Sequence, residues 1–357
     1  MINKLKRFLF FSTIIFSLCQ QAKAIEPTWE VNMGSLFDNR EGDAGMTNPK
    51  TYFMVTLAPE IGLKFTQHDR IAGGAVWNQP LENGVKDGKI VPTLYYRHES
   101  DSWNFSMGMF PRTQLREPLP GFLWCDSLAY FQQNIRGALV QYNHRKGFFD
   151  AFIDWRGMQT ETRREAFNIV FHGEFKPKGE TFLLGSHLMM NHLAKTKHPD
   201  ESQSVIDNFL INPYIGVDLS KKTALDSLVL KAGGLLTIER NRGDDEGWRV
   251  PGGLWIDLVA EWKFLGLKNS LYAGGKLFPE YNLFGSQLYL GEPFYQSSFY
   301  NRTDIYAKII QNKYMNLEAQ LNFNFAKNNF IFYQRLILDV HLGNLTSSNK
   351  RVHKIYQ

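Results

Sequence analysis

The chain has 357 residues, a net charge of +5, 14% aromatic residues and two cysteines. Four of its 40 basic residues lie in the segment 1–24, which we expect to be removed, and the remaining 36 nearly balance the 35 acidic residues. This charge balance gives no reason to expect nucleic acid binding, which needs a concentrated basic face. Cys125 would then be the single cysteine, which excludes an intrachain disulfide, and we expect no cofactor and no metal.

Residues 1–24 have the layout of a secretory signal peptide. Basic residues precede an apolar run at 8–18, and the small residues Ala22 and Ala24 follow, which predicts cleavage after Ala24. A membrane anchor is the first alternative, but the run is shorter than the ~20 residues that a spanning helix needs. A lipid-modified Cys19 is the second, and the bulky residue before it argues against that interpretation.

The rest of the chain has no apolar run of spanning length, so helical membrane spans are excluded. Strict alternation of polar and apolar residues takes their place. In 317–325, Leu, Ala, Leu, Phe and Phe alternate with Glu, Gln, Asn and Asn, and 256–264 repeats the pattern with larger side chains. Period two with one apolar face is typical of a strand between lipid and a wet interior.

The same pattern predicts an all-β fold, a transmembrane antiparallel β-barrel of sixteen strands over residues 25–343. Short turns, which we assign to the periplasm, alternate with longer outside loops, as in outer-membrane barrels. A soluble β-sandwich is the alternative, and it would need a linker that is not seen. Residues 344–357 are expected to form a periplasmic tail. The expected strands are 27–37, 50–65, 68–79, 89–99, 102–111, 136–145, 147–157, 163–175, 180–194, 208–219, 226–239, 252–264, 267–279, 302–312, 314–325 and 329–342.

In its architecture the chain resembles the sixteen-stranded porins of Gram-negative outer membranes. The resemblance implies a water-filled lumen for small hydrophilic solutes, contact with outer-membrane lipid, a homotrimer, and a third outside loop that folds into the barrel. Here that loop is 111–135. Its three prolines forbid strand pairing, and Asp126 could cap a short helix that ends at Gly137. The acidic loop motif of the general porins and a terminal aromatic residue are both absent.

Charges of both signs at a constriction create a transverse field that selects solutes by size and charge. We therefore expect a porin without enzymatic turnover, narrowed by the loop at 111–135. Solvation of a wet lumen is the ordinary explanation for any single charge. The candidate loop and lumen residues are Arg112, Arg116, Glu117, Asp126, Asp150, Asp154, Lys231, Asp257, Glu261, Lys263, Lys276 and Arg335.

Three other interpretations remain open. An outer-membrane enzyme acting on lipid or peptide would need a nucleophile and a base, and His172, Glu174 and His187 are the nearest candidates for acid-base or metal chemistry. Surface polysaccharide export or assembly could use the long loops at 195–207 and 280–301. Saccharide passage would add aromatic rings along the lumen; the candidates are Tyr95, Tyr272, Trp255, Trp248, Tyr289, Phe294 and Tyr295.

Overall fold

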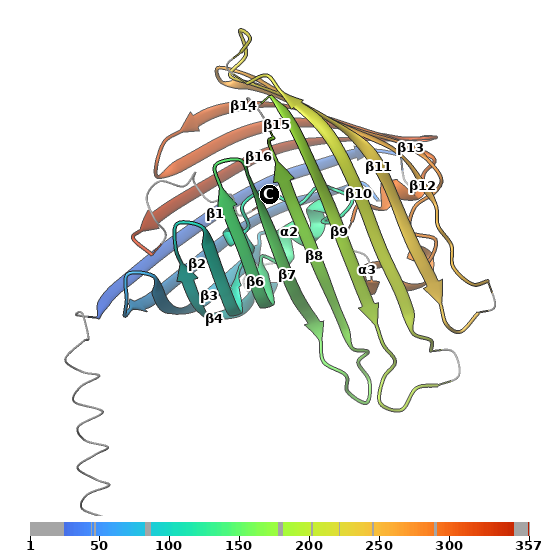
Figure 1. The fold of residues 1–357 in the computed structure, drawn as a ribbon, viewed down its shortest axis with the longest axis horizontal. Helices are drawn as coiled ribbons and strands as arrows, with labels where there is room; N and C mark the ends of the chain where they lie inside the picture. The colour runs from blue at the N-terminus through green and yellow to red at the C-terminus, as the bar shows by residue number, and fades with distance from the viewer. Residues whose placement is uncertain are drawn as a thin grey trace, which may run out of the picture.

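The computed structural model describes residues 25–43, 45, 48–82, 87–177, 181–200, 203–220, 222–244, 246–288, 291–345 and 356. Sixteen antiparallel strands close into one barrel, in which each strand pairs with its neighbours in sequence and β1 pairs with β16 (Figure 1). This confirms the predicted fold class. The strands are β1 (Glu26–Gly42), β2 (Lys50–Lys64), β3 (Asp69–Pro80), β4 (Lys89–Glu99), β5 (Trp103–Pro111), β6 (Asn134–His144), β7 (Gly147–Gly157), β8 (Ala166–Phe175), β9 (Phe182–Leu193), β10 (Ile206–Asp218), β11 (Ser227–Asn241), β12 (Gly252–Trp262), β13 (Leu265–Gly274), β14 (Phe299–Gln311), β15 (Met315–Ala326) and β16 (Asn329–Gly343).

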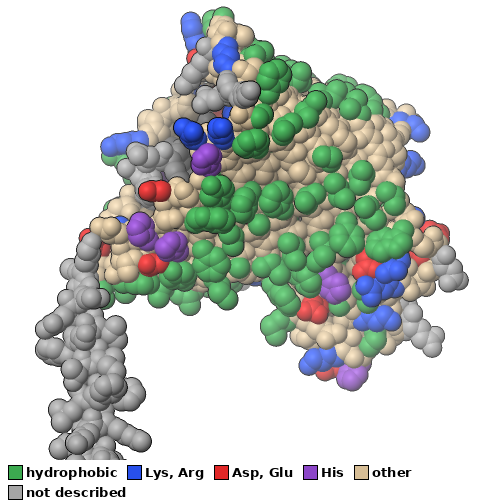
Figure 2. Space-filling model, in the orientation of Figure 1, with side chains coloured by type: hydrophobic (Ala, Val, Ile, Leu, Met, Phe, Trp, Pro, Cys, Tyr) green, Lys and Arg blue, Asp and Glu red, His purple; other side chains and the backbone are tan. Residues whose placement is uncertain are grey.

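The alternation along each strand separates the two faces of the wall. In β15, Glu318 and Asn322 are buried on the inside, whereas Leu321 and Phe325 on the outside are 43% and 46% exposed. Figure 2 shows hydrophobic side chains spread over the outer surface of the barrel. The outer face therefore suits lipid, and every backbone group between neighbouring strands can be paired, as a membrane requires.

The connections differ at the two ends of the barrel. At the end that we assign to the periplasm, two residues connect β6 to β7 and two connect β12 to β13. At the other end, 112–133 and 275–298 form the longest connections. The predicted alternation of short turns and long loops is thereby confirmed. None of the described helices is both long and apolar enough to cross a membrane.

Both of the longest connections fold into the barrel. Loop 112–133 contains the 3-10 helix η2 (Arg112–Gln114) and the helix α2 (Asp126–Phe131), and loop 275–298 contains α3 (Tyr281–Leu288) and η3 (Pro293–Gln296). The predicted extent of the first helix was wrong, because Ile135 and Gly137 already belong to β6. The Asp126 side chain also does not cap α2, since Cys125 occupies the N-cap position without a side-chain bond.

The structure describes some of the residues after β16 but none of the first 24 residues of the chain. The predicted signal peptide, 1–24, lies outside the described residues. After β16, the backbone N–H groups of Asn344 and Leu345 both donate to the Trp29 carbonyl, at 2.9 and 3.1 Å. Tyr356, the last described residue, is buried inside the barrel, where Figure 1 places the C-terminus. The periplasmic tail at 344–357 otherwise stays a prediction.

Candidate functional site: the barrel interior

Loop 112–133 is attached to the inner wall at its beginning by a buried ion pair. Arg112 Nη2 lies 2.8 Å from Asp154 Oδ2, and both side chains are less than a tenth exposed. The Arg112 guanidinium also lies 3.8 Å from the centre of the Trp124 ring, within the same loop. A charge this far from water is stable only because it is paired and stacked. Arg112 therefore secures the loop and is not available to a passing solute.

The middle of the loop carries a second, larger ion-pair network. The Asp126 carboxylate accepts from Arg302 on β14, at 2.9 Å, and from Arg335 on β16. Arg335 in turn lies 3.3 Å from Asp38 on β1, which pairs with Arg40 at 2.8 Å. Because three strands and α2 meet in one network, the loop is held across the interior of the barrel. This confirms that the third outside loop folds inward.

The two in-folded loops contact each other directly. The Glu292 N–H donates to the Gly121 carbonyl at 2.7 Å, and the Asp126 N–H donates to Glu292 Oε1 at 2.8 Å. A Cβ at Gly291 would lie 2.3 Å from the Phe122 carbonyl oxygen, so only glycine allows this approach. Burial, together with the nearby Asp126 carboxylate, raises the pKa of Glu292. The two loops thus form one plug.

Three more of the predicted residues lie near the start of the loop. Asp150 is buried and accepts from the Arg116 backbone N–H at 2.7 Å and from Gln141 Nε2 at 3.0 Å. The Arg116 side chain instead reaches Asn143, and Glu117 is exposed. Asp150 therefore shapes the loop backbone, while Arg116 and Glu117 are the loop charges that retain contact with water.

The inner faces of β11 to β14 are more exposed to water than the part of the wall that lies beside loop 112–133. Lys231 pairs with Glu174 at 2.7 Å and Lys308 pairs with Glu261 at 2.8 Å, with side chains 11–24% exposed. Asp257 faces Lys231 directly in the register of β11 and β12, and it is only partly buried. Charges of both signs thus line a part of the interior that water reaches.

Two predicted lumen residues do not lie on strands. Lys263 follows the end of β12 and lies in the turn, with Nζ 4.7 Å from the centre of the Trp262 ring. Lys276 follows the end of β13 and is exposed in the outside loop. Their assignment to strand faces was wrong, because both strands end earlier than the alternation predicted.

The candidate acid-base group of the enzyme alternative, His172, Glu174 and His187, does not assemble. The His172 and His187 rings stack at 4.3 Å, and His187 Nδ1 lies 3.0 Å from Asn212 Oδ1, whereas Glu174 pairs with Lys231. Within the described residues, neither ring has a Ser, Thr or Cys side chain as a hydrogen-bond partner. No group of three or more His, Cys, Asp or Glu side chains in this part of the chain could hold a metal.

The aromatic residues expected on the lumen face do point inward, but they are packed. Tyr95, Tyr272 and Trp255 are each at most 3% exposed, and Phe122 of the loop lies edge-on to Trp255 at 5.7 Å. Phe294 and Tyr295 are buried in the same core, Trp248 is exposed, and Tyr289 lies outside the described residues. The rings form a hydrophobic core under the plug and do not offer open stacking faces.

Several residues of the central network were not predicted from the sequence. Arg40, Asp38, Glu292 and Arg302 were not among the candidates. Asp38 and Arg40 continue the inward phase of β1, which extends to Gly42 and not to residue 37. Arg302 lies at the edge of the expected strand, and the alternation of β14 could have identified it. Glu292 had no periodic signal, since it lies in an irregular loop.

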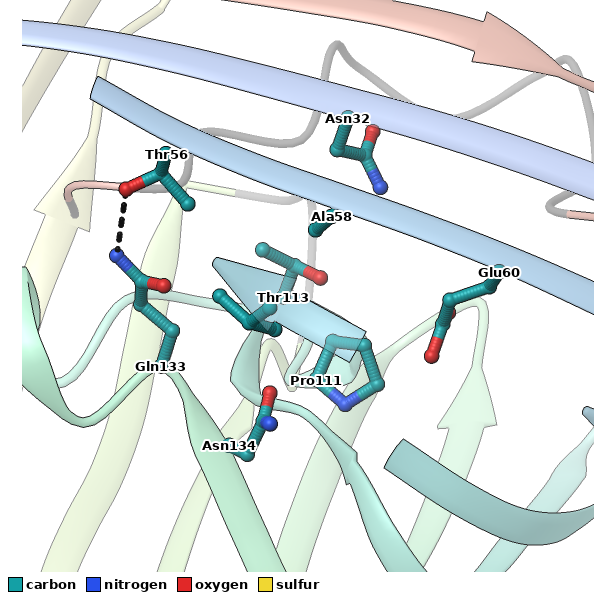
Figure 3. A pocket seen from close by; sticks show the side chains of 9 residues that line it. Asn32, Thr56, Ala58, Glu60, Pro111, Thr113, Gln133 and Asn134 are labelled. Carbon is teal, nitrogen blue, oxygen red and sulfur yellow. Dashed lines mark hydrogen bonds between the residues drawn. The ribbon is translucent and has the colours of Figure 1, made fainter. Parts of the chain in front are cut away.

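A small pocket lies between the wall and the two ends of loop 112–133. Figure 3 shows Glu60, Thr56 and Ala58 of β2 on one side, and Gln133 and Asn134 on the other, with Gln133 directed at Thr56. Gln133 Nε2 donates to Thr56 Oγ1 at 3.4 Å. Oxygen atoms of Glu60, Gln133 and Asn134 are buried and have no hydrogen-bond partner among the described residues. The pocket is therefore rich in acceptors.

Solved structures with the same fold are outer-membrane proteins. The outer membrane protein OprD from Pseudomonas aeruginosa superposes with a TM-score of 0.53 at 10% identity, over 94% of this chain and 98% of that one. Pseudomonas aeruginosa OccK2, solved with glucuronate, gives 0.50 at 11% identity, over 90% and 99%. Acinetobacter baumannii OccAB3 gives 0.50 at 10% identity, over 89% and 100%. At these identities the likeness concerns the fold.

The closed barrel, its apolar outer wall and its inward third loop define a transmembrane β-barrel with the fold of the outer membrane protein OprD. A comparison with curated proteins finds no match. Residues 20–347 match the family described as "Lipid A 3'-O-deacylase-type". Because the match extends over most of the sequence, the chain belongs to this family.

Proposed function

We propose that the barrel passes small hydrophilic solutes across the outer membrane. The observation that carries this proposal is the hydrated, mixed-charge inner face of β11 to β14. Lys231 and Glu261 are 22% and 24% exposed there, although both point into the barrel. A sealed interior would leave such charges dry and costly, so their exposure supports a water-filled route along this side.

The same geometry supports a narrow and selective route. Loop 112–133 and loop 275–298 fill part of the interior with buried side chains, among them Phe122 and Phe294, both at most 1% exposed. What remains is bordered by Lys231, Asp257 and Lys268, whose opposite charges would orient a dipolar solute. We therefore propose small conductance steps and discrimination by charge.

Conductance in planar bilayers tests the proposal. Purified protein should give stepwise current increases, and a salt gradient should give a reversal potential that depends on the interior charges. The matched variants are Lys231→Gln, inside the barrel, and Lys276→Gln, in the exposed outside loop. Only the first should change the reversal potential. An electrically silent barrel with intact heat-modifiable mobility on gels would refute the proposal.

A second candidate function is ester cleavage in lipid A, and the family match favours it. The geometry offers less support, because the described His172 and His187 rings have no hydroxyl or thiol partner. Incubation of the purified protein with lipid A, followed by mass spectrometry, separates the candidates. Loss of the 3'-linked acyl chain would establish an enzyme, and unchanged lipid A together with ion conduction would favour transport.

We also propose that the barrel assembles as a homotrimer through the outer face of β13 and β14. Asn269, Asn301 and Thr303 all point to the lipid side and hydrogen-bond to each other, with Asn269 Nδ2 donating to Thr303 Oγ1 at 2.8 Å. Polar groups facing hydrocarbon are costly unless they are covered. Cross-linking in native membranes should give trimers, and Asn269→Leu should disrupt them. Trimers that persist in this variant would show that this face lies outside the contact.

A further inference from the structure

Ion pairs line much of the hydrated inner face of the barrel. Among the described residues of this face, Lys231 pairs with Glu174 at 2.7 Å, Lys308 with Glu261 at 2.8 Å, and Arg302 with Asp304 at 2.9 Å. Each of these charges therefore has a partner of opposite sign within the wall. Asp257 of β12 and Lys268 of β13 lie between these pairs on the same inner face.

Asp257 and Lys268 differ from the charges around them. In the part of the chain that the structure describes, neither side chain has a hydrogen bond or an ion pair. Lys231, which is opposite Asp257 in the strand register, pairs with a residue of β8 instead. Asp304, which is opposite Lys268, has both carboxylate oxygens bound by Arg302 Nε, at 2.9 and 3.0 Å. One negative and one positive charge are thus left over close to each other.

Both side chains are accessible from the lumen. Lys268 is exposed, with Nζ 5.5 Å from the centre of the Tyr306 ring, and Asp257 is partly exposed. Asp257 is the direct register partner of Ser270, and Lys268 lies two residues before Ser270 on the same face. Asp257 and Lys268 are therefore diagonal neighbours, whose Cβ atoms lie within roughly 8 Å of each other. One small molecule can contact both groups at once.

The chemistry of the two groups defines the ligand. An ammonium group of a solute can donate to the Asp257 carboxylate, and a carboxylate can accept from the three N–H donors of Lys268. A solute with only one charge would leave the other wall charge without a partner. Val259, directly beside Lys268 on β12, is partly exposed and offers an apolar contact. An α-amino acid with a short aliphatic side chain combines both charges and an apolar group in one small molecule.

We propose that Asp257 and Lys268 form a binding site for zwitterionic α-amino acids with short, uncharged side chains. Asp257 accepts hydrogen bonds from the α-ammonium group, and Lys268 donates to the α-carboxylate. The two groups together carry no net charge, so a solute with a net charge gains less from them. The inference rests on the proposed function, because the solute reaches the site through the water-filled route, and it names the class of solute that this route selects.

Titration of the purified barrel with L-alanine tests the site directly. Binding is measured in a non-ionic detergent by saturation-transfer difference NMR, which needs no ion current. Propionate and ethylamine are the matched probes, because they correspond to alanine without its ammonium group and without its carboxylate. Each should bind roughly tenfold more weakly than L-alanine, as expected for the loss of one charged hydrogen bond.

Two variants assign the two charges to the two residues. Asp257→Asn should weaken L-alanine binding about tenfold but should not weaken propionate binding, because propionate has no ammonium group. Lys268→Gln should weaken L-alanine binding equally but should not weaken ethylamine binding. A change that disturbed the fold would weaken all three probes. Lys276→Gln, in the exposed outside loop, is the control and should alter none of them.

The outcomes separate the site from the proposed function. Equal binding of the three probes, or L-alanine binding that both variants retain, would overturn the site. The first of these results needs only the unaltered barrel, so the test does not depend on the folding of the variants. A barrel that conducts ions without this binding pattern would refute the site and leave the proposed function intact. An electrically silent barrel that shows the pattern would refute conduction and leave the site intact.

Discussion

The two sides of the barrel interior use the same residue types for opposite purposes. Next to loop 112–133, Asp38 is fully buried and Asp154 is 5% exposed, each in an ion pair with arginine. On β11 and β12, Lys231 and Glu261 are 22% and 24% exposed. The first set attaches a plug, and the second remains in contact with water. An inward-facing charge in a barrel is therefore no evidence of a pore until what covers it is known.

The difference also concerns how the charges are connected. On the packed side, Asp126 joins Arg302 and Arg335, and Arg335 continues to Asp38, so the removal of one group affects several elements. On the hydrated side, Lys231 with Glu174 and Lys308 with Glu261 are separate pairs. Partly exposed pairs contribute little to stability, which leaves them available for solute selection.

Deletion of part of the plug should have the largest effect, and it should change the single-channel conductance. Deleting Thr113 to Gly121 removes the segment between the Arg112 anchor and the core residue Phe122. We expect a severalfold increase in single-channel conductance, because water would replace packed side chains. A shortened outside loop at 243–247 is the control and should leave conductance unchanged. An unaltered current after the first deletion would contradict the assignment of the plug.

Weakening the ion-pair network around Asp126 should have the next largest effect. Asp126→Asn keeps the shape of the side chain but removes the charge that faces Arg302 and Arg335. Breaking a buried pair costs roughly 3–5 kcal/mol, and we expect less here, since Arg335 keeps Asp38 and Arg302 keeps Asp304. The heat-modification temperature should fall and current noise should rise.

The exposed Asp244→Asn is the matched control for that variant, since Asp244 lies in an outside loop. Its heat-modification temperature should equal that of the unaltered protein. If Asp126→Asn also leaves both the temperature and the noise unchanged, the network does not hold the loop.

The hydrated side should respond in selectivity and hardly in stability. Asp257→Asn removes a carboxylate opposite Lys231 and should shift the reversal potential toward anion preference. Thermal stability should stay the same, because Asp257 has no ion pair within the described residues. An equal shift for Glu82→Gln, an exposed outside residue, would show that the whole surface charge determines selectivity.

The smallest effect should be a pH dependence of the contact between the two loops. Burial and the Asp126 carboxylate raise the pKa of Glu292, so the folded arrangement favours the protonated form. Its stabilisation is complete below the usual carboxyl pKa of about 4.3 and is lost as pH rises through the raised value. Conductance fluctuations should therefore be more frequent at pH 8 than at pH 5. Glu292→Gln should remove the difference, and a persisting difference would point to another group.

Most of the wall could be predicted from the sequence, because alternation is a local property. Strands such as β4, Lys89–Glu99, and β7, Gly147–Gly157, have the predicted bounds. Errors appear where the chain leaves the wall: β13 ends at Gly274, five residues before its predicted end, and α2 ends at Phe131. In those places contacts with distant elements decide where the backbone turns.

The candidate site was less predictable. The alternation correctly places Asp150, Asp154, Lys231 and Asp257 on the inner face, but it cannot say which of them a loop will cover. Asp126 was a candidate for a helix cap, and its actual partners Arg302 and Arg335 lie more than 170 residues away. No local pattern contains that information.

By itself, the sequence determined a sixteen-stranded barrel with an apolar outer face and an inward third loop, because period two, turn lengths and prolines act over short distances. The tertiary structure decided which inward-facing charges are buried beside the two loops and where Tyr356 lies. Those outcomes depend on ion pairs and packing between segments that only barrel closure brings together, such as Asp126 with Arg335 and Tyr356 with Thr56.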